Sequence, residues 1–420
     1  MTPDPDGVPL QASGSAGGAE PPRKRYRTII RMVPVRTPPP VEEWRLTRQL
    51  TPPRTYTFAT DFSGLDMASF AVKDAANGAK VVQRFACDNW HRARTFCRTN
   101  HEPAFFFDDV VHRPTTWPNL WGYFAGPPCQ PWSSVGLRKG EGDDRSDLFD
   151  KAIDFVCVVL PAFCVIENSP LLLTYLQGTW LQARVARLTR AGYGVSTGLL
   201  NAEDHGLPQS RSRCYVVGIR NDARRSLPPL VQLQGDKLLS IQDVLAPPLA
   251  SDDPTAEPKA TWTTAVKNAR EALEVARRDA LDQDWVIAHQ KGEGFTGPAG
   301  PTPKVYWPCL LHANTNGYWI GSRGRHATLS ETSRAQGLTT EGVSWPRGPD
   351  AFRLLGNSFA KPVIERLVAQ GLRHSGLEAA RDRWEEGTAQ ARIRNDAKAD
   401  RSHAPPVTLH DMWKKSPAAI

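Results

Sequence analysis

Residues 57–73 read TFATDFSGLDMASFAVK, and this stretch indicates the fold of the chain. Residues 57–62 predict a strand, Ser63 and Gly64 predict the turn that ends it, and residues 66–73 have the apolar spacing of a helix. The same alternation continues, with strands predicted at 79–87, 105–107, 120–125 and 162–166 and helices at 89–99 and 148–160. This order predicts an α/β fold with a doubly wound, mostly parallel sheet that helices cover on both faces.

Length and composition limit the classes of protein to consider. The 420 residues suffice for one large domain and a small one. No stretch approaches 18 uninterrupted apolar residues, so no membrane span is expected, and the first 20 residues lack the apolar core of a secretory signal. The seven cysteines are scattered without a CxxC pair. We therefore expect a reducing compartment, no disulfide framework and no metal site.

The positive charge is concentrated at the N-terminal end of the chain. The formal net charge is +8, and residues 1–54 contribute +4 of it, from nine Lys and Arg against five acids. Because the segment is also rich in proline, residues 1–53 are predicted to be a disordered arm. Such an arm either meets a polyanion or is a solvated tail without specific function.

Three blocks of polar residues carry the functional signal. Cys129 lies in Gly-Pro-Pro-Cys-Gln-Pro-Trp-Ser at 126–133, Glu167 and Asn168 follow an apolar run, and residues 209–213 read Gln-Ser-Arg-Ser-Arg. A Pro-Cys-Gln loop, then Glu-Asn, then Gln-x-Arg-x-Arg resembles the DNA (cytosine-5) methyltransferases. The blocks at 328–337 and 356–358 also resemble this family. The resemblance covers about 56–370, with interruptions, and implies a Rossmann-like S-adenosylmethionine-dependent methyltransferase.

The chemistry of such an enzyme explains these residue types. A thiolate that adds to C6 of cytosine makes C5 nucleophilic, and Cys129, in a polar loop, fits that role. Glu167 follows an apolar strand, where burial raises the pKa of a carboxyl, and it is expected to protonate N3. Arg211 and Arg213 share one face of a strand, so one is expected to orient Glu167 and the other the base or its phosphate. Five further cysteines are interpreted as structural, since they lie in apolar segments: Cys87, Cys157, Cys164, Cys214 and Cys309.

The resemblance also implies a pocket for S-adenosylmethionine at the first strand-to-helix turn. Asp88 takes the place of the family's usual Glu, which accepts both ribose hydroxyls, and Asp109 resembles the residue that reads the adenine amino group. Asp66 stands where the family usually has a second glycine. Either Asp88 or Asp109 alone would more often be a turn residue or helix cap. The residues assigned to the cofactor are Phe62, Ser63, Gly64, Leu65, Asp88, Asn89, Asp109, Val110, Gly126, Pro128, Leu148, Asn357 and Ser358.

The implied macromolecular partner is double-stranded DNA, from which the target base must be flipped. The glycine-containing loop at 132–145 is expected to close over that base, although it also fits a plain flexible loop. The residues assigned to nucleic acid are Gln130, Ser133, Arg138, Lys139, Asn168 and Gln209. A membrane partner is not expected, and a monomer is compatible with the sequence, which does not fix the oligomeric state.

These observations predict a division of the chain into five parts. The clearest helix is expected at 262–284, in the small lobe. The parts are a disordered arm at 1–53, the first part of the catalytic domain at 54–245, a small target-recognition lobe at 246–308, the returning part of the catalytic domain at 309–372, and a charged helix and tail at 373–420.

Two other functions remain open from the sequence. A tRNA cytosine-5 methyltransferase shares every block, but members of that branch have a Cys-Phe-Thr sequence that this chain lacks. A catalytically weak paralogue that binds DNA or a partner is suggested only by Asp66. The location is nuclear for a eukaryotic protein, given the basic run at 23–27, and otherwise the cytoplasm or nucleoid.

Overall fold

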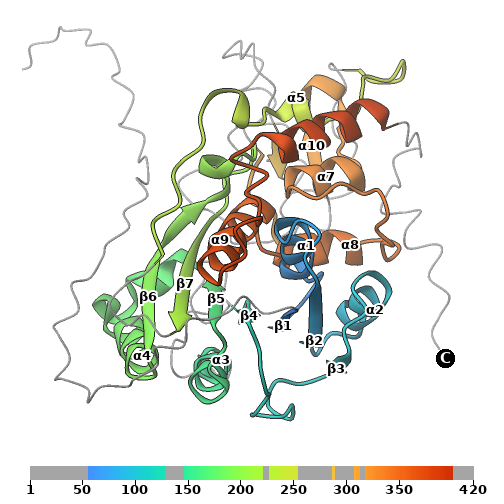
Figure 1. Ribbon diagram of the computed structural model, residues 1–420. Helices are drawn as coiled ribbons and strands as arrows, with labels where there is room; N and C mark the ends of the chain where they lie inside the picture. The colour runs from blue at the N-terminus through green and yellow to red at the C-terminus, as the bar shows by residue number, and fades with distance from the viewer. Residues whose placement is uncertain are drawn as a thin grey trace, which may run out of the picture.

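The structure is a computed structural model that describes residues 55–128, 146–220, 227–253, 286–288, 307–312 and 317–400. A seven-stranded sheet with the order β3-β2-β1-β4-β5-β7-β6 forms its centre (Figure 1). Its strands are β1 (Tyr56–Asp61), β2 (Val81–Cys87), β3 (Phe105–Phe107), β4 (Gly122–Ala125), β5 (Phe163–Asn168), β6 (Tyr193–Asn201) and β7 (Ser212–Arg220). The principal helices are α1 (Met67–Ala75), α2 (His91–Asn100), α3 (Ser146–Val159), α4 (Thr179–Arg190), α5 (Ile241–Val244), α7 (Leu329–Ala335), α8 (Asp350–Asn357), α9 (Lys361–His374) and α10 (Thr388–Ala399).

The doubly wound fold and the mostly parallel sheet are confirmed. The first five strands pair in parallel, whereas β7 runs antiparallel to both β5 and β6. Each of the five predicted strands forms within two residues of its predicted ends. β1 ends one residue earlier than expected, because Phe62 has a φ of 54° and leaves the extended conformation.

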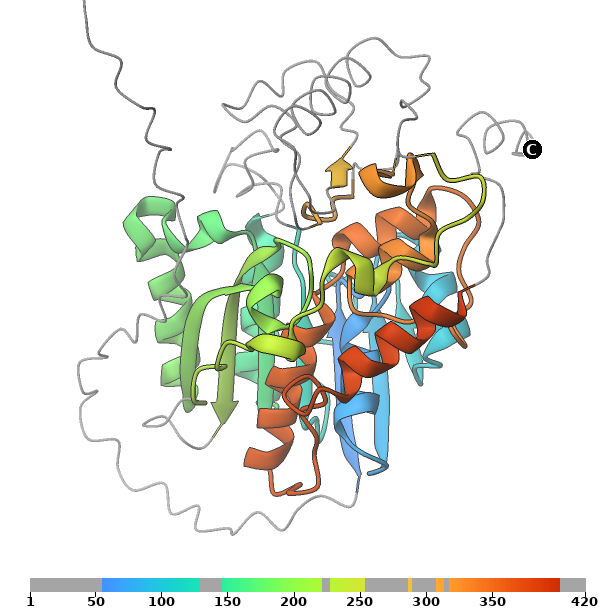
Figure 2. The same ribbon diagram turned by 90° about the horizontal axis from the view of Figure 1, so that it is seen from above.

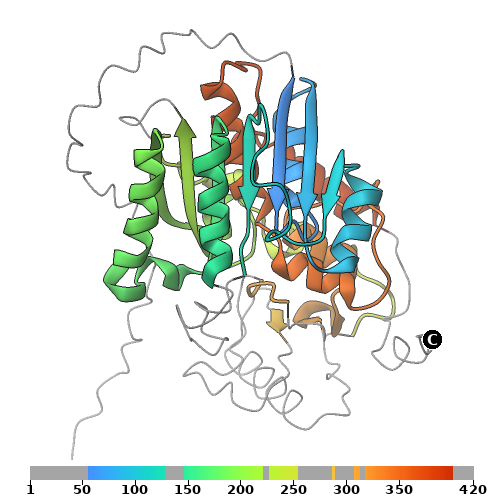
Figure 3. The ribbon, with the colours of Figure 1, turned by 90° about the horizontal axis from the view of Figure 1, so that it is seen from below.

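The alternation of side chains along the strands builds two cores, one on each face of the sheet. In β5, Phe163 and Val165 belong to one buried cluster, while Cys164 and Ile166 belong to the other. α1 and α9 pack together on the first face, and α3 and α4 lie on the second (Figure 3). Since both faces are covered, β5 can be a continuous apolar run, as expected of a buried parallel strand.

The order of the strands determines where a ligand can bind. After β1 the chain moves to β2 on one side, and it later returns to place β4 on the other side of β1. The carboxyl ends of β1 and β4 therefore flank a topological switch point, where open α/β sheets bind ligands. β7 is antiparallel to β5, so the start of β7 reaches this same edge.

A second, three-stranded sheet stands near the edge at which the parallel strands end (Figure 3). It has the order β10-β9-β8, from β8 (Val286–Ala288), β9 (Tyr318–Ile320) and β10 (Arg325–His326). The boundary predicted at residue 308 thus falls between two strands of one sheet. The predicted arm at 1–53, the loop at 132–145 and the helix at 262–284 lie outside the described residues.

The C-terminal extension differs from its prediction. In place of one charged helix at 373–403, the chain leaves α9 at His374 and begins α10 at Thr388. Between them Trp384 is fully buried, and α10 lies beside α5 at the outside of the molecule (Figure 2). Arg334 of α7 anchors the end of α10 through ion pairs with Asp396 and Asp400, at 2.9 and 2.8 Å. In the described ranges, no helix is both long and apolar enough to cross a membrane.

Candidate active site

The three sequence blocks meet at the carboxyl edge of the sheet. Glu167 pairs with Tyr215 in the register of β5 and β7, so the start of β7 lies beside the end of β5. Arg213 and Arg211 precede Tyr215 by two and four residues, which places them on the same face of the strand. The predicted convergence of the acid and the two guanidiniums follows from this antiparallel pairing.

Glu167 has the environment of a general acid. It is 8% exposed, and the Arg213 Nε lies 3.1 Å from its Oε1. Burial raises the pKa of Glu167 above its ordinary value, and the guanidiniums of Arg213 and then Arg211 only partly oppose this rise. The carboxyl therefore keeps its proton to a higher pH than a solvated glutamate does.

The two arginines have different partners. Arg213 forms the ion pair with Glu167, as expected for the orienting residue. Arg211 instead donates to three backbone carbonyls, those of Leu310 at 2.7 Å, Ser358 at 2.6 Å and Gly356 at 3.2 Å. The expected contact of this second arginine with a base or phosphate is thus replaced by a clasp that binds the returning segment to the start of β7.

Gly356 makes this clasp possible through its lack of a side chain. A Cβ at Gly356 would lie 2.3 Å from the carbonyl carbon of Leu311 and 2.5 Å from the nitrogen of His312. Any larger residue would push the segment at 307–312 away from α8. The glycine of the block at 356–358 therefore has a packing role at the site.

The loop that leads to Cys129 begins against the acid. A Cβ at Gly126 would lie 3.8 Å from the Glu167 Oε2, and the Asn168 side chain donates to the carbonyl of Pro127 at 3.2 Å. These contacts hold the last two residues before Pro128 beside the end of β5. Cys129 itself lies outside the described residues, as do Gln130, Ser133, Arg138 and Lys139.

The predicted cofactor turn is held by Asp88. Its Oδ2 accepts from the backbone N–H of Gly64 at 2.8 Å, and its Oδ1 accepts from that of Trp90 at 2.9 Å. Burial raises the pKa of Asp88, although these two hydrogen bonds oppose the rise. A Cβ at Gly64 would meet no atom within 4 Å, so the turn borders open space. A half-buried acceptor beside an open turn fits a ligand with hydroxyl groups.

Asp66, the departure from the family pattern, has a structural explanation. Its φ of 56° is the conformation in which glycine is favoured and Asp is tolerated. Its carboxylate caps α1 by accepting from the Ser69 N–H, and it also accepts from Thr60 at 3.0 Å and Gln83 at 2.5 Å. Asp66 therefore adopts the backbone conformation that favours glycine. Its carboxylate joins a buried hydrogen-bond network below the turn.

The remaining predicted cofactor residues have different degrees of access. Phe62, Ser63, Asp109, Gly126, Pro128 and Leu148 are half-buried, and Asn89 and Asn357 are exposed. The side chains of Leu65, Val110 and Ser358 are buried.

Several of these residues already have protein partners, Ser63 and Asn357 among them. Asp109 accepts from the Val111 N–H at 2.8 Å, and Ser358 donates to the Leu355 carbonyl at 2.8 Å. Leu65 belongs to the core, so only its backbone remains for a ligand.

Two residues assigned to nucleic acid have their side-chain amides engaged within the protein. Gln209 is fully buried, and its amide binds the Ala335 carbonyl, Gln336 and the Leu310 N–H. Asn168 is 1% exposed and holds the Pro127 carbonyl. Both amides stabilise the site from within, because their hydrogen-bonding groups are directed at the protein.

Sequence reasoning missed a buried ion pair beneath the site. Arg113 donates from Nε to both oxygens of Asp61 at 2.9 Å, and the Tyr123 hydroxyl donates to Asp61 at 2.5 Å. Arg113 also lies 4.0 Å from the centre of the Phe155 ring. Asp61 ends β1, so it could have been found as a polar residue at a strand end, but its partner lies 52 residues later.

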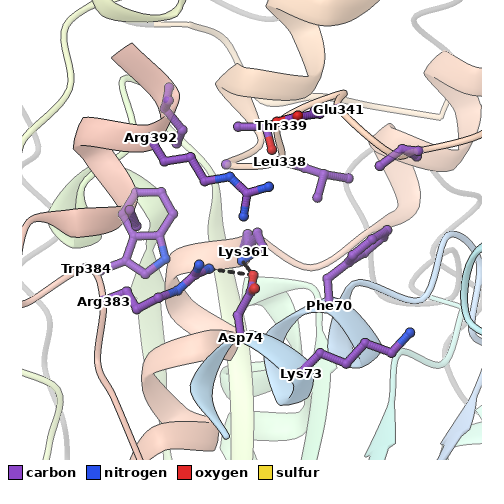
Figure 4. A pocket seen from close by; sticks show the side chains of 14 residues that line it. Phe70, Lys73, Asp74, Leu338, Thr339, Glu341, Lys361, Arg383, Trp384 and Arg392 are labelled. Atoms are coloured by element: carbon purple, nitrogen blue, oxygen red, sulfur yellow. Dashed lines mark hydrogen bonds and ion pairs between the residues drawn. The ribbon is translucent and has the colours of Figure 1, made fainter. Parts of the chain in front are cut away.

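A cavity in the described part of the chain lies away from these residues. It has a volume of about 150 Å³ and lies between α1, α9 and the C-terminal extension (Figure 4). Asp74, Lys361 and Arg383 line it, and none of the predicted site residues does. Across the described ranges, no group of three or more His, Cys, Asp or Glu side chains is arranged to hold a metal ion.

Comparison with known proteins identifies the relatives of this chain. A profile of the C-5 cytosine-specific DNA methylases matches residues 61–372. The Type II methyltransferase M.NlaX of Neisseria lactamica is 42% identical over 274 residues, which cover 62% of this chain and 77% of that protein. The Type II methyltransferase M.MthTI of Methanothermobacter thermautotrophicus is 33% identical over 139 residues, which cover 33% of this chain and only 42% of that protein.

A solved structure supports the fold alone. A DNMT2 mutant of Spodoptera frugiperda superimposes with a TM-score of 0.51 at 16% sequence identity, over 75% of this chain and 99% of that one. At this identity the likeness extends to the arrangement of helices and strands.

Proposed function

The chain belongs to the C-5 cytosine-specific DNA methylase family, and from this premise we propose that it transfers a methyl group from S-adenosylmethionine to C5 of cytosine in double-stranded DNA. The observation that supports this most is Glu167, a buried acid with a raised pKa, paired with Arg213 and placed beside the loop that leads to Cys129. An acid and a thiol are the pair of groups that a methyl transfer to a pyrimidine carbon requires.

The reaction begins at the base. The Cys129 thiolate adds to C6, and Glu167 donates its proton to N3, so negative charge does not build up on the ring. Arg213 holds the Glu167 carboxyl in place and stabilises the carboxylate that remains after the proton is given. C5 thereby becomes nucleophilic. Once C5 carries the methyl group, a base takes up the C5 proton, the bond between C6 and the Cys129 sulfur breaks, and the proton on N3 returns to Glu167, which restores the ring.

The cofactor side of the site is supported by the turn after β1. S-adenosylmethionine, when bound, supplies the electrophilic methyl group. Asp88 is the acceptor we assign to its ribose hydroxyls, and the open turn at Ser63 and Gly64 is the place we assign to its charged end. We assign the remainder of the cofactor to Asp109, which is half-buried, and Asn357, which is exposed.

We further infer that the protein works on chromosomal DNA in the cytoplasm. The two curated relatives named above come from a bacterium and an archaeon. On this view the basic run at 23–27 serves contact with the phosphate backbone and not nuclear import. All proposed site residues belong to one chain, so a monomer suffices.

A methylation assay on two substrates tests the proposal. The full chain is incubated with donor labelled in its methyl group and with either duplex DNA or tRNA, and Cys129→Ser serves as the inactive control. We expect label at C5 of cytosine in DNA, none in tRNA and none with the control. Label in tRNA alone would identify an RNA methyltransferase, and no label in either would identify a binding protein.

A further inference from the structure

A second cysteine lies in the proposed site. Cys309 belongs to the segment at 307–312, which the Arg211 clasp holds against the start of β7. The Arg211 Nη1 lies 3.5 Å from the Cys309 sulfur, and the Arg213 Nη2 lies 3.4 Å from it. Two guanidiniums from one strand thus donate to a single sulfur.

This environment distinguishes Cys309 from the other described cysteines. Burial raises the pKa of Cys87, Cys97, Cys157 and Cys214, and it raises that of Cys164 to about 12. Burial would raise the pKa of Cys309 too, but Arg213 and Arg211 outweigh it, so its pKa lies below the ordinary value. Cys309 therefore differs from the other cysteines that were interpreted as structural.

Arg213 links this sulfur to the acid. Its Nη2 contacts the sulfur, while its Nε lies 3.1 Å from the Glu167 Oε1. A thiolate at Cys309 compensates part of the positive charge of Arg213. Less of that charge is then available to stabilise an ionised Glu167. A deprotonated Cys309 thus favours the protonated form of Glu167, and a neutral residue at this position favours the carboxylate.

The other groups around Cys309 do not replace this effect. Tyr215 lies on the same strand face, with burial raising its pKa, and the Tyr318 hydroxyl donates to the Cys309 carbonyl at 3.4 Å. His312, on the same segment, has its pKa lowered by burial and then by Arg353, and its Nδ1 lies 3.0 Å from the Asn357 amide nitrogen. Neither tyrosine nor a neutral histidine supplies negative charge near neutral pH.

We propose that Cys309 is a positioning residue for methyl transfer: its sulfur holds the Arg211 and Arg213 guanidiniums and, through Arg213, keeps Glu167 in the protonated form that donates to N3. This inference rests on the proposed function, because it gives Cys309 a part in the same reaction. The sulfur acts through Arg213 and does not itself attack the base.

The first test is the pH profile of kcat in three variants. Cys309→Ser keeps the size but removes the negative charge, and Cys309→Asp restores a charge. Cys157→Ser is the matched control at a half-buried cysteine whose pKa is influenced by Arg187 and Arg190, and not by Arg211 or Arg213. In Cys309→Ser we expect the alkaline limb of the profile to move to lower pH, because Glu167 loses its proton earlier. Above neutral pH kcat should fall about 3- to 10-fold, a part of what general acid catalysis supplies, with KM unchanged.

Cys309→Asp should return the limb toward its original position, and Cys157→Ser should leave it in place. A Cys309→Ser profile that coincides with the wild-type profile would overturn the proposal. So would an equal displacement in the Cys157→Ser control.

The second test reads the thiol directly and needs no methylation. Wild-type protein is treated with iodoacetamide between about pH 6 and 9, where thiolates differ most in abundance, and each cysteine is quantified by peptide mass spectrometry. We expect Cys309 to react at lower pH than Cys157. Equal onset for the two would overturn the proposal.

The two tests separate the possible failures. Early alkylation of Cys309 in a protein that methylates neither DNA nor tRNA would refute the proposed function and leave the electrostatics of this cluster intact. Methylation of DNA with coinciding pH profiles would refute the role of Cys309 alone.

Discussion

Two buried clusters of charge in this molecule use the same residue types in opposite ways. At the sheet edge, Glu167 faces Arg213 at 3.1 Å. Between α1, α9 and the C-terminal extension, Asp74 lies 2.5 Å from both Lys361 and Arg383 (Figure 4). Each cluster places a carboxylate next to cations in a poorly solvated setting, but the carboxylates respond differently.

The number of cations in contact explains the difference. Burial alone would raise the pKa of both acids. For Asp74 the ammonium of Lys361 and the guanidinium of Arg383 outweigh burial, so its pKa lies below the ordinary value. For Glu167 one direct ion pair is not enough, so its pKa stays raised. A carboxylate in contact with two cations serves stability, whereas one left partly uncompensated can give up a proton in a reaction.

The largest expected effect is that of Glu167→Gln on methyl transfer. The amide keeps the size of the side chain but cannot protonate N3, so kcat should fall about 10²- to 10⁴-fold. In the wild type, activity should be lost as the pH rises through the raised pKa of Glu167. Steady-state methylation of duplex DNA measures both effects.

The free energy of unfolding should respond differently at the two clusters, and Glu167→Gln tests this at the sheet edge. The raised pKa means that ionising Glu167 disfavours the folded state as the pH increases, so Glu167→Gln should not lower the free energy of unfolding at neutral pH. A variant that melts early while its folded fraction keeps full activity would assign Glu167 to structure.

The next effect in size is that of Asp74→Asn on unfolding. Breaking a fully buried ion pair costs about 3–5 kcal/mol, and because Asp74 is 24% exposed we expect about 2 kcal/mol at neutral pH. Its lowered pKa means that this stabilisation is present above the ordinary value of 3.8 and is lost as the pH falls through the folded-state pKa. Urea unfolding at several pH values measures the loss.

Asp154→Asn is the matched control, since Asp154 is half-exposed and paired with Arg187. It should change the free energy of unfolding by less than about 1 kcal/mol. Methylation per folded molecule should be unchanged in Asp74→Asn. A loss of activity without a loss of stability would show that Asp74 takes part in methyl transfer. The two clusters would then no longer differ in role.

The smallest effect concerns Asp88, a half-buried acid whose partners are backbone N–H groups instead of cations. Asp88→Ala removes the proposed acceptor of the ribose hydroxyls, which should cost about 1.5–3 kcal/mol of S-adenosylmethionine binding. Calorimetric titration measures the loss, with Asp108→Ala, at an exposed position next to β3, as control. Equal dissociation constants for the Asp88 variant and the wild type would move the ribose contact elsewhere.

The fold could be predicted where local patterns decide it. The strand and helix around Gly64 follow from short-range periodicity, and so do the other strands of the parallel half. The C-terminal extension could not be predicted in the same way, because Trp384 is buried by contacts with Gly206 and Gly337, which come from distant parts of the chain. The sequence shows that this extension is charged, but it does not show which distant residues cover Trp384.

The features of the site that could be predicted depend on residues close together in the sequence. One of Arg211 and Arg213 was expected beside Glu167, because alternation along a strand fixes direction, and Arg213 is the one that pairs with it. The protein partners of Gln209 could not be predicted, because they lie more than a hundred residues later. The lowered pKa of Cys309 could not be predicted either, because its sequence neighbours are apolar and the two guanidiniums come from the distant start of β7.

The central claim, that Cys129 attacks cytosine beside a buried acid, is tested most directly by covalent trapping. The full chain is mixed with S-adenosylmethionine and duplex DNA that contains 5-fluorocytosine, in which fluorine at C5 blocks the final elimination. We predict a protein–DNA adduct that survives denaturation and that peptide mass spectrometry assigns to Cys129, and no adduct with Cys129→Ser. An adduct that persists in Cys129→Ser, or its absence from wild-type protein that methylates normal DNA, would contradict the account.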